Sequence, residues 1–453
     1  INSNSKMYGA ESGSVFGIGN GKENSSTIGS CDNSVIVIDG KALIKQNVYG
    51  GGNYGATGVS STSNSSTTKI IINNGIIKGS VYGGGNKNGS GSTSKSSTIN
   101  IKMYNGNIVG SIYGGSNEEG TIYGNIDIHV YGGEITNSVY GGGRGGIDNN
   151  SNGTFVRNNI NINIGDSNSN YTPIINGSVY GGSAFGTVNG TANSTNVSTS
   201  NTHVTINKGI ITNVFGGGEG NDIYTPYVLG DINVTVNDGT ITNVFGGNDK
   251  KGSPNGTIEV YINGGTITST YGGGNETSAK ETNVYLNGGS STKIFGGSNL
   301  SGNVTTSHVT TTGGSSEVVY GGNNQGGTTG TTNVLINGGT IGTVYGGGDA
   351  TSVSNSTNVT INSNVSTVFG GSNLSGDIPV SNISVNNANT TNIYGGNNQG
   401  GLTTTSNIGI FGGYQENVYG GGLKAETTTT NINANYGFIN NLYGGGSEAG
   451  ATR

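Results

Sequence analysis

An aromatic residue followed by two glycines recurs along almost the whole chain. In Thr340–Asp349 the element reads Thr-Ile-Gly-Thr-Val-Tyr-Gly-Gly-Gly-Asp, and its copies settle at spacings of 24–25 residues. Val, Ile or Leu precedes the aromatic residue in every copy except one. A period of this length is typical of solenoids and other stacked-repeat proteins. The aromatic residues of the element are Tyr49, Tyr82, Tyr113, Tyr140, Tyr180, Phe215, Phe245, Tyr271, Phe295, Tyr320, Tyr345, Phe369, Tyr394, Tyr419 and Tyr443.

A second element lies between the aromatic copies and has the period of a β-strand. Asn333–Asn337 reads Asn-Val-Leu-Ile-Asn, with close relatives at Asn233–Asn237 and Asn283–Asn287. Apolar and polar residues alternate over these five positions, as in a strand with one buried face. A corner of the form Asn-Gly-Gly follows, and there we expect a positive φ at Gly338 or Gly339, which glycine adopts without strain. One coil is therefore predicted to contain three short strand-like pieces separated by corners.

Stacking such coils predicts an all-β fold, a parallel β-solenoid (β-helix) of about fifteen coils of roughly 24–40 residues. Equivalent strands of neighbouring coils would lie about 4.8 Å apart. Val334, Ile336, Ile341 and Val344, with their equivalents, are predicted to fill the interior. Asparagines at the corners are expected to form hydrogen-bonded ladders. Only 30% of the 453 residues are hydrophobic and 91 are glycine, which suits a thin continuous core.

The spacing of the copies divides the chain into four parts. Residues 1–34 are an irregular segment or a degenerate first coil, and residues 447–453 are a C-terminal tail. Residues 35–270 are predicted to form a solenoid with long edge loops. Residues 271–446 are regular, with a 74-residue repeat that indicates duplication of a three-coil unit. We expect flexible, solvated loops, all leaving one edge, at Asn53–Thr68, Asn86–Thr98, Arg144–Asn158 and Ser183–Asn201.

These two elements together resemble the glycine-rich β-strand repeats of bacterial cell-surface proteins. The resemblance covers residues 35–446. It implies a parallel β-solenoid in an extracellular adhesin or fibre-forming protein, and it brings no catalytic motif with it. Because the chain begins at Ile1 without an initiator methionine, we expect a processed product or an excerpt of a longer protein.

Catalysis is not predicted. Active sites of polysaccharide-degrading β-helix enzymes need clustered carboxylates and basic residues, whereas only 9% of this chain is charged. His203 and His308 occupy the same place in the repeat but lie four coils, or roughly 19 Å, apart, which is too far for a dyad. We expect these two and His129 to be solvent-exposed strand residues. A degradative enzyme stays the least favoured alternative.

No cofactor is expected, and the composition argues against several partners. The net charge is −6 without a basic stripe, which disfavours nucleic acid. No apolar run reaches the roughly 18–20 residues that a membrane helix needs. Cys31 is the only cysteine, so no internal disulfide forms.

A metal site is not predicted either. The acidic residues Glu219, Asp222, Asp231, Asp238 and Asp249 make calcium conceivable, because Ca²⁺ prefers oxygen ligands. Their spacing matches neither an EF-hand nor a calcium-binding β-roll. A solvated polar edge is the favoured interpretation.

The aromatic residues are the best candidate site. Neighbours on a strand point to opposite faces, so if Val344 points inward then Tyr345 points outward. The eleven tyrosines and four phenylalanines would then form an exposed column that binds carbohydrate or packs against another rod. The alternative is that the rings are buried and the valines lie at a corner.

Two functions follow from this sequence. The first hypothesis is a non-enzymatic extracellular structural protein, a rod that assembles head-to-tail or laterally into a surface fibre. Self-association is expected because neither end of the sequence shows a capping helix over the strand edges. The alternative is a surface adhesin that binds carbohydrate through the aromatic column or the edge loops.

Overall fold

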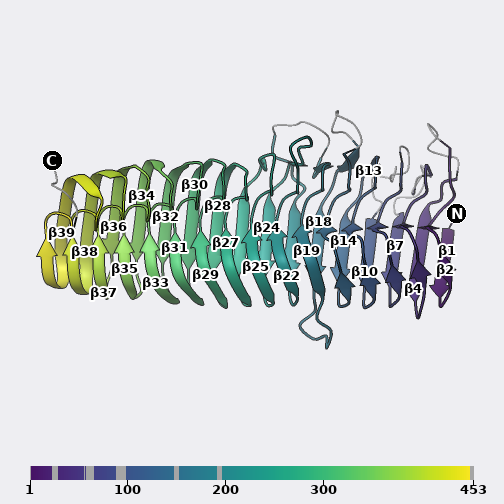
Figure 1. The fold of residues 1–453 in the computed structure, drawn as a ribbon, viewed down its shortest axis with the longest axis horizontal. Helices are drawn as coiled ribbons and strands as arrows, with labels where there is room; N and C mark the ends of the chain where they lie inside the picture. The colour runs from purple at the N-terminus through teal and green to yellow at the C-terminus, as the bar shows by residue number, and fades with distance from the viewer. Residues whose placement is uncertain are drawn as a thin grey trace. The chain divides into compact units, whose positions relative to one another are not determined.

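The computed structural model describes most of the chain. Within the described ranges, every regular element is a β-strand. The chain divides into two compact units, unit 1 (Ile1–Thr242 and Asn248–Gly256) and unit 2 (Asn243–Gly247 and Thr257–Arg453). Each unit is a parallel β-solenoid whose successive coils lie side by side (Figure 1). The described residues are 2–22, 29–55, 57, 66–87, 98–146, 153–190 and 196–448.

The first coils of unit 1 contain three short strands each, as predicted. Equivalent strands pair in parallel and in register, for example Ile36 with Ile70 and Val48 with Val81. Residues 2–16 belong to this stack, since their strands pair with those of the next coil. The strands are β1 (Asn2–Tyr8), β2 (Glu11–Ser12), β3 (Val15–Phe16), β4 (Asn33–Asp39), β5 (Leu43–Ile44), β6 (Val48–Tyr49), β7 (Thr67–Ile72), β8 (Ile76–Ile77), β9 (Val81–Tyr82), β10 (Thr98–Met103), β11 (Asn107–Ile108) and β12 (Ile112–Tyr113).

Later in unit 1 the second and third pieces of the coil merge into one strand, so the three-strand prediction is wrong there. β19 pairs with both β15 and β16 and then, through a register shift, with β22. The early coils carry one extra residue at this corner, such as Gly79, which β22 lacks. The remaining strands of the main sheet in unit 1, of which β15 and β16 are still separate, are β14 (Ile126–Val130), β15 (Glu134–Ile135), β16 (Val139–Tyr140), β18 (Ile160–Ile164), β19 (Ile174–Tyr180), β21 (Thr202–Ile206), β22 (Ile210–Phe215) and β24 (Ile232–Val236).

A second, smaller sheet arises from the loops of unit 1. Four short strands pair in parallel, and Ile122, Val156, Val188 and Val228 on them are buried. The expectation that Arg144–Asn158 and Ser183–Asn201 are wholly flexible is therefore wrong, because apolar residues inside them stack coil over coil. Much of the other two predicted loops lies outside the described residues. The strands are β13 (Gly120–Ile122), β17 (Thr154–Val156), β20 (Thr187–Val188) and β23 (Tyr227–Val228).

The coils of unit 2 contain two strands each, except the last two, in which one strand runs through the corner. Strand β25 (Thr240–Phe245) crosses the unit boundary, and its last three residues belong to unit 2. The others are β26 (Ile258–Ile262), β27 (Thr266–Tyr271), β28 (Ala279–Leu286), β29 (Ser290–Phe295), β30 (Val304–Thr311), β31 (Ser315–Tyr320), β32 (Thr329–Ile336), β33 (Thr340–Tyr345), β34 (Val353–Ile361), β35 (Val365–Phe369), β36 (Ile378–Val385), β37 (Thr390–Tyr394), β38 (Leu402–Tyr419) and β39 (Glu426–Tyr443).

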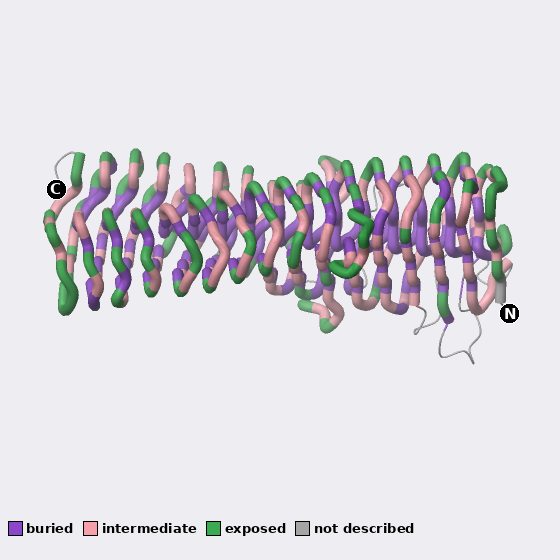
Figure 2. The backbone as a smooth tube through the Cα atoms, turned by 90° about the horizontal axis from the view of Figure 1, so that it is seen from below, coloured by how far each residue is buried: buried purple, intermediate pink, exposed green. Residues whose placement is uncertain are grey.

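The predicted core is confirmed. Val344 and Ile336 are fully buried, and Val334 and Ile341 are 2% and 4% exposed. Buried residues line the inside of the coils and exposed residues lie at the corners (Figure 2). Alternation along each strand thus places one apolar row inside every coil.

The corners also follow the prediction. Gly339 has a φ of 89°, and the equivalent Gly265 and Gly289 have φ values of 81° and 64°. Side-chain amides form the expected ladder: Asn362 Nδ2 donates to Asn337 Oδ1 at 2.6 Å, and Asn386 Nδ2 donates to Asn362 Oδ1 at 2.8 Å. Each corner is therefore tied to the corners beside it.

The three-coil period is visible in the residue that follows each glycine pair, which differs among three successive coils. From Gly274 to Gly422 this residue cycles through glycine, serine and asparagine, as at Gly348, Ser372 and Asn397. Ser372 Oγ accepts from the Gly348 backbone N–H at 3.1 Å, and Asn397 Oδ1 accepts from the Ser372 N–H at 2.7 Å. Asn397 Nδ2 also donates to the carbonyls of Gly376 and Gly400. Each kind of residue thus fits a different loop.

Candidate functional site

The aromatic residues form a stacked column that is buried through most of the chain. In unit 1 the rings from Phe16 to Phe215 follow one another at centroid distances of 4.7–5.1 Å. In unit 2 the rings from Phe245 to Tyr443 do so at 4.5–5.0 Å. From Tyr49 to Tyr394 every residue of the column is at most 9% exposed. The favoured expectation of an exposed column is therefore wrong for these coils.

The rings are buried although they point away from the inner apolar row. The chain bends at the glycines after each ring. The residue four positions after one ring then covers a ring of an earlier coil. Asn398 Nδ2 donates to the Tyr345 hydroxyl at 3.3 Å, and Asn373 Nδ2 donates to the Tyr320 hydroxyl at 3.5 Å. Burial raises the pKa of Tyr345 to about 12, against the effect of the Asn398 hydrogen bond. Each covering residue comes from two coils further along.

We call these covering residues the flanking row. Its amides bond to one another as well: Asn86 to Asn53 at 2.7 Å in unit 1, and Asn398 to Asn373 at 2.7 Å in unit 2. This row was not predicted from the sequence, although mostly polar residues at a constant offset of four from the rings were a visible signal. Its described members are Asn53, Asn86, Asn117, Arg144, Ala184, Glu219, Asp249, Asn275, Asn299, Asn324, Asp349, Asn373, Asn398, Leu423 and Ser447.

Charged residues replace asparagine at part of the flanking row of unit 1. The Tyr140 hydroxyl donates to Glu219 Oε2 at 2.7 Å, and the Tyr180 hydroxyl donates to Asp249 Oδ2 at 3.4 Å. Burial, and then the charge of Asp249, raise the pKa of Glu219, while the Tyr140 hydrogen bond opposes the shift. These two carboxylates bind tyrosines of the column. Among the described residues, no three His, Cys, Asp or Glu side chains gather as a metal ion would require.

Replacing Glu219 with glutamine should raise the melting temperature at pH 7 and change it less at pH 4. The raised pKa means that Glu219 favours the folded state only while protonated, below the ordinary pKa of a carboxyl group. That contribution is lost as the pH rises through the raised pKa. Glutamine stays neutral and still accepts from Tyr140. Thermal melts at both pH values measure this, with exposed Asp222→Asn as control; equal shifts at both pH values would contradict the prediction.

The three histidines lie on the surfaces of strands. His203 is exposed, as expected, and pairs in register with Asn161 and Asn233. His308 is half-buried. His129 differs from the expectation because its ring stacks on Tyr131 at 3.6 Å, and burial lowers its pKa.

No known protein family, no curated protein and no solved structure matches this chain. None of the described residues forms a helix long and apolar enough to cross a membrane. The chain is a repeat protein with a parallel β-solenoid fold, and stacked aromatic rings and amide ladders join its coils.

Proposed function

We propose that this chain is a non-enzymatic structural protein that works outside the cell or at its surface and self-associates through its coil edges. The observation that carries the proposal is that four kinds of contact repeat from coil to coil. These are the in-register backbone ladder, the inner apolar row, the stacked rings and the amide ladders. Side chains inside and outside the coils thus serve to join coils, as expected of a stiff support.

The edge of strand β39 supports self-association. Over its 18 residues β39 pairs with β38, and no described strand pairs with its other side. Leu442 and Tyr443, which continue the buried rows of the preceding coils, are 55% and 45% exposed. Figure 2 shows the exposed residues along this coil. An unpaired edge of this length is a template for another strand.

We propose that the partner is the β1 edge of a second copy. In the described part of the chain, β1 pairs with β4 alone. A contact between two different edges is heterologous and propagates as a filament if it does not close. The resemblance of the repeats to those of bacterial surface proteins supports the extracellular location. A glycan-binding role for the column is not proposed, because its rings from Tyr49 to Tyr394 are buried.

Ala434→Pro should abolish self-association without unfolding the chain. Backbone N–H groups along a parallel strand alternate between its two neighbours, and Asn386 N donates back to Ile361 O. Val385, which precedes Asn386, therefore directs its N–H to the next coil. Val385 pairs in register with Ile410, and Ile410 pairs in register with Ala434, so the N–H of Ala434 points away from β38. Proline at 434 then removes only an outward donor. Sedimentation velocity and negative-stain microscopy measure the assembly.

The matched control is Asn433→Pro, which removes an N–H directed to β38 and should lower the melting temperature. Wild-type protein that stays monomeric at high concentration would refute the assembly. Filaments of A434P as long as those of the wild type would refute pairing through β39.

A further inference from the structure

An exposed group of aromatic residues stands at the corner of the last two coils. We call Phe411, Tyr414, Tyr436 and Phe438 the aromatic corner; they are 40%, 42%, 77% and 58% exposed. Phe411 pairs in register with Tyr436, and Tyr414 pairs with Phe438. These residues lie at the corner between the two parts of each coil. They are not members of the aromatic column, to which Tyr419 and Tyr443 of the same two coils belong.

Polar residues occupy the same places in the preceding coil. Val385 pairs with Ile410, so Asn386 is the counterpart of Phe411. Asn389 Oδ1 accepts from the Tyr414 backbone N–H at 2.8 Å, which places Asn389 beside Tyr414. The amide ladder of the corners, which includes Asn362 and Asn386, thus gives way to aromatic side chains. Two coils therefore carry a surface that the other corners of unit 2 lack.

The aromatic corner is held in place. The ring of Phe411 lies over Gly409, where a Cβ atom would come within 2.7 Å of it. The rings of Tyr414 and Phe438 stack at 5.6 Å. The Tyr414 hydroxyl donates to Glu416, and Asn440 Nδ2 donates to Glu416 Oε1 at 2.9 Å. Three of the four rings, those of Phe411, Tyr414 and Phe438, are thus oriented before any ligand arrives, which lowers the entropic cost of binding.

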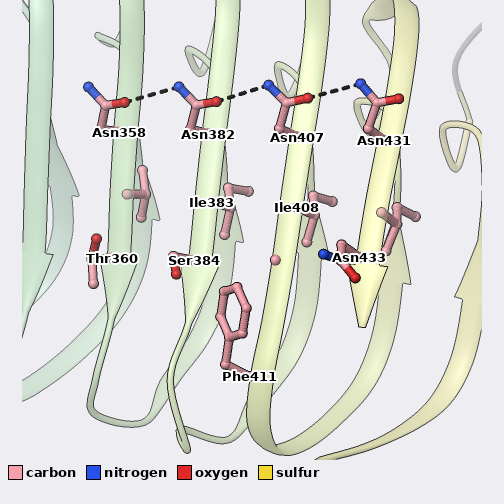
Figure 3. A pocket seen from close by; sticks show the side chains of 13 residues that line it. Asn358, Thr360, Asn382, Ile383, Ser384, Asn407, Ile408, Phe411, Asn431 and Asn433 are labelled. Carbon is pink, nitrogen blue, oxygen red and sulfur yellow. Dashed lines mark hydrogen bonds between the residues drawn. The ribbon is translucent and has the colours of Figure 1, made fainter. Parts of the chain in front are cut away.

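An open groove lies on the Phe411 side, with a volume of about 480 Å³. Its polar wall is a row of four asparagines joined by three hydrogen bonds of 2.9–3.0 Å, in which each later amide donates to the one before it (Figure 3). An amide nitrogen has two hydrogens, and the ladder uses one of them at Asn382, Asn407 and Asn431, whereas Asn358 Nδ2 also donates to the Thr332 carbonyl at 3.3 Å. The row therefore offers a repeated set of hydrogen-bonding groups along the groove. Its members are Asn358, Asn382, Asn407 and Asn431.

A second groove lies on the Tyr414 side, with a volume of about 510 Å³. Asn364, Asn389, Tyr414 and Glu416 are among the residues that line it. The two grooves therefore flank the aromatic corner, and each has aromatic and polar walls. Both volumes fall in the range of about 300–1,000 Å³ that is typical of ligand sites.

We propose that the aromatic corner and its two grooves bind an unbranched β-1,4-linked polysaccharide. Such a chain is flat, with C–H groups on its faces and hydroxyls around its edges. The rings would stack on the C–H faces, while the asparagine row and Glu416 would bond to the hydroxyls. Open grooves accept a polymer that continues past the site. A protein partner is less well matched, because the charged Glu416 lines one groove and hydrogen-bonded asparagines line the other, whereas interface cores are depleted of charged residues.

The double variant Phe411→Asn/Tyr414→Asn tests this site. It puts the residue of the preceding coil at both places, so it removes the rings while keeping side chains that this fold already carries there. The control is Tyr171→Asn, which removes a 55% exposed ring of unit 1. Circular dichroism and melting temperature establish that both variants fold.

Binding is measured by isothermal titration calorimetry with cellohexaose and chitohexaose, and with the α-1,4-linked maltohexaose as comparison. We expect at least one β-1,4 hexamer to bind, maltohexaose to bind at least about 10-fold more weakly, and the double variant to lose at least about 10-fold in affinity. A tenfold change corresponds to about 1.4 kcal/mol. The Tyr171 variant should bind as the wild type does.

Three results would overturn the proposal. These are the absence of binding to both β-1,4 hexamers, unchanged affinity in the folded double variant, and an equal loss in the Tyr171 variant. Sedimentation of the double variant separates this site from the proposed assembly. Loss of self-association there, without sugar binding by the wild type, would assign the rings to a protein contact instead.

Discussion

Val344→Asp is expected to lower the free energy of unfolding by about 4–5 kcal/mol, the range of the most damaging single substitutions. Val344 is fully buried and pairs in register with Val319 and Val368, which are fully buried as well. An aspartate there would lie between two apolar side chains, and the adjacent rows supply no cation. A buried carboxylate without a partner is costly or must take up a proton. Urea denaturation followed by circular dichroism measures the change.

Thr340→Asp is the matched control because it adds the same charge to the same strand. Thr340 is exposed, so its replacement should change the free energy of unfolding by no more than about 0.5 kcal/mol. An unchanged denaturation midpoint for V344D would contradict the assignment of the inner row. Equal losses in both variants would show that strand β33 tolerates no charge on either face.

Asn323→Ala is expected to lower the free energy of unfolding by about 3–5 kcal/mol, because it leaves several buried groups without partners. Asn323 is fully buried. Its Nδ2 donates to the carbonyls of Gly302 at 2.8 Å and Gly326 at 3.0 Å, and its Oδ1 accepts from the Ser298 N–H at 2.8 Å. The alanine methyl group replaces none of these bonds.

Two further variants check the Asn323 prediction. Asn397 makes the equivalent bonds 74 residues later, so Asn397→Ala should cost the same within error. Asn324 is half-buried and donates to Asn299 at 2.7 Å, so Asn324→Ala should cost only about 1 kcal/mol. A loss at Asn323 no larger than at Asn324 would refute the role of the buried asparagine.

The sequence determined the fold class, the inner row and the corners. These features depend on neighbours along the chain: alternation selects the buried face of Val334 and Ile336, and the glycines of Asn337–Gly339 supply the corner. Repetition at a constant period then requires that equivalent residues stack. The amide ladder from Asn337 to Asn362 follows from the same reasoning, because its members differ by one period.

Only the tertiary structure decided whether the rings are buried. Tyr345 and the Asn398 that covers it are 53 residues apart, and the path of the chain after the glycines brings them together. Strand alternation correctly separates Val344 from Tyr345, but it does not report what packs on the outer face. The aromatic corner is a similar case, since Phe411 and Tyr436 become neighbours through a register shift. Local pattern fixes which face a side chain takes, whereas coils further along the chain decide what covers that face.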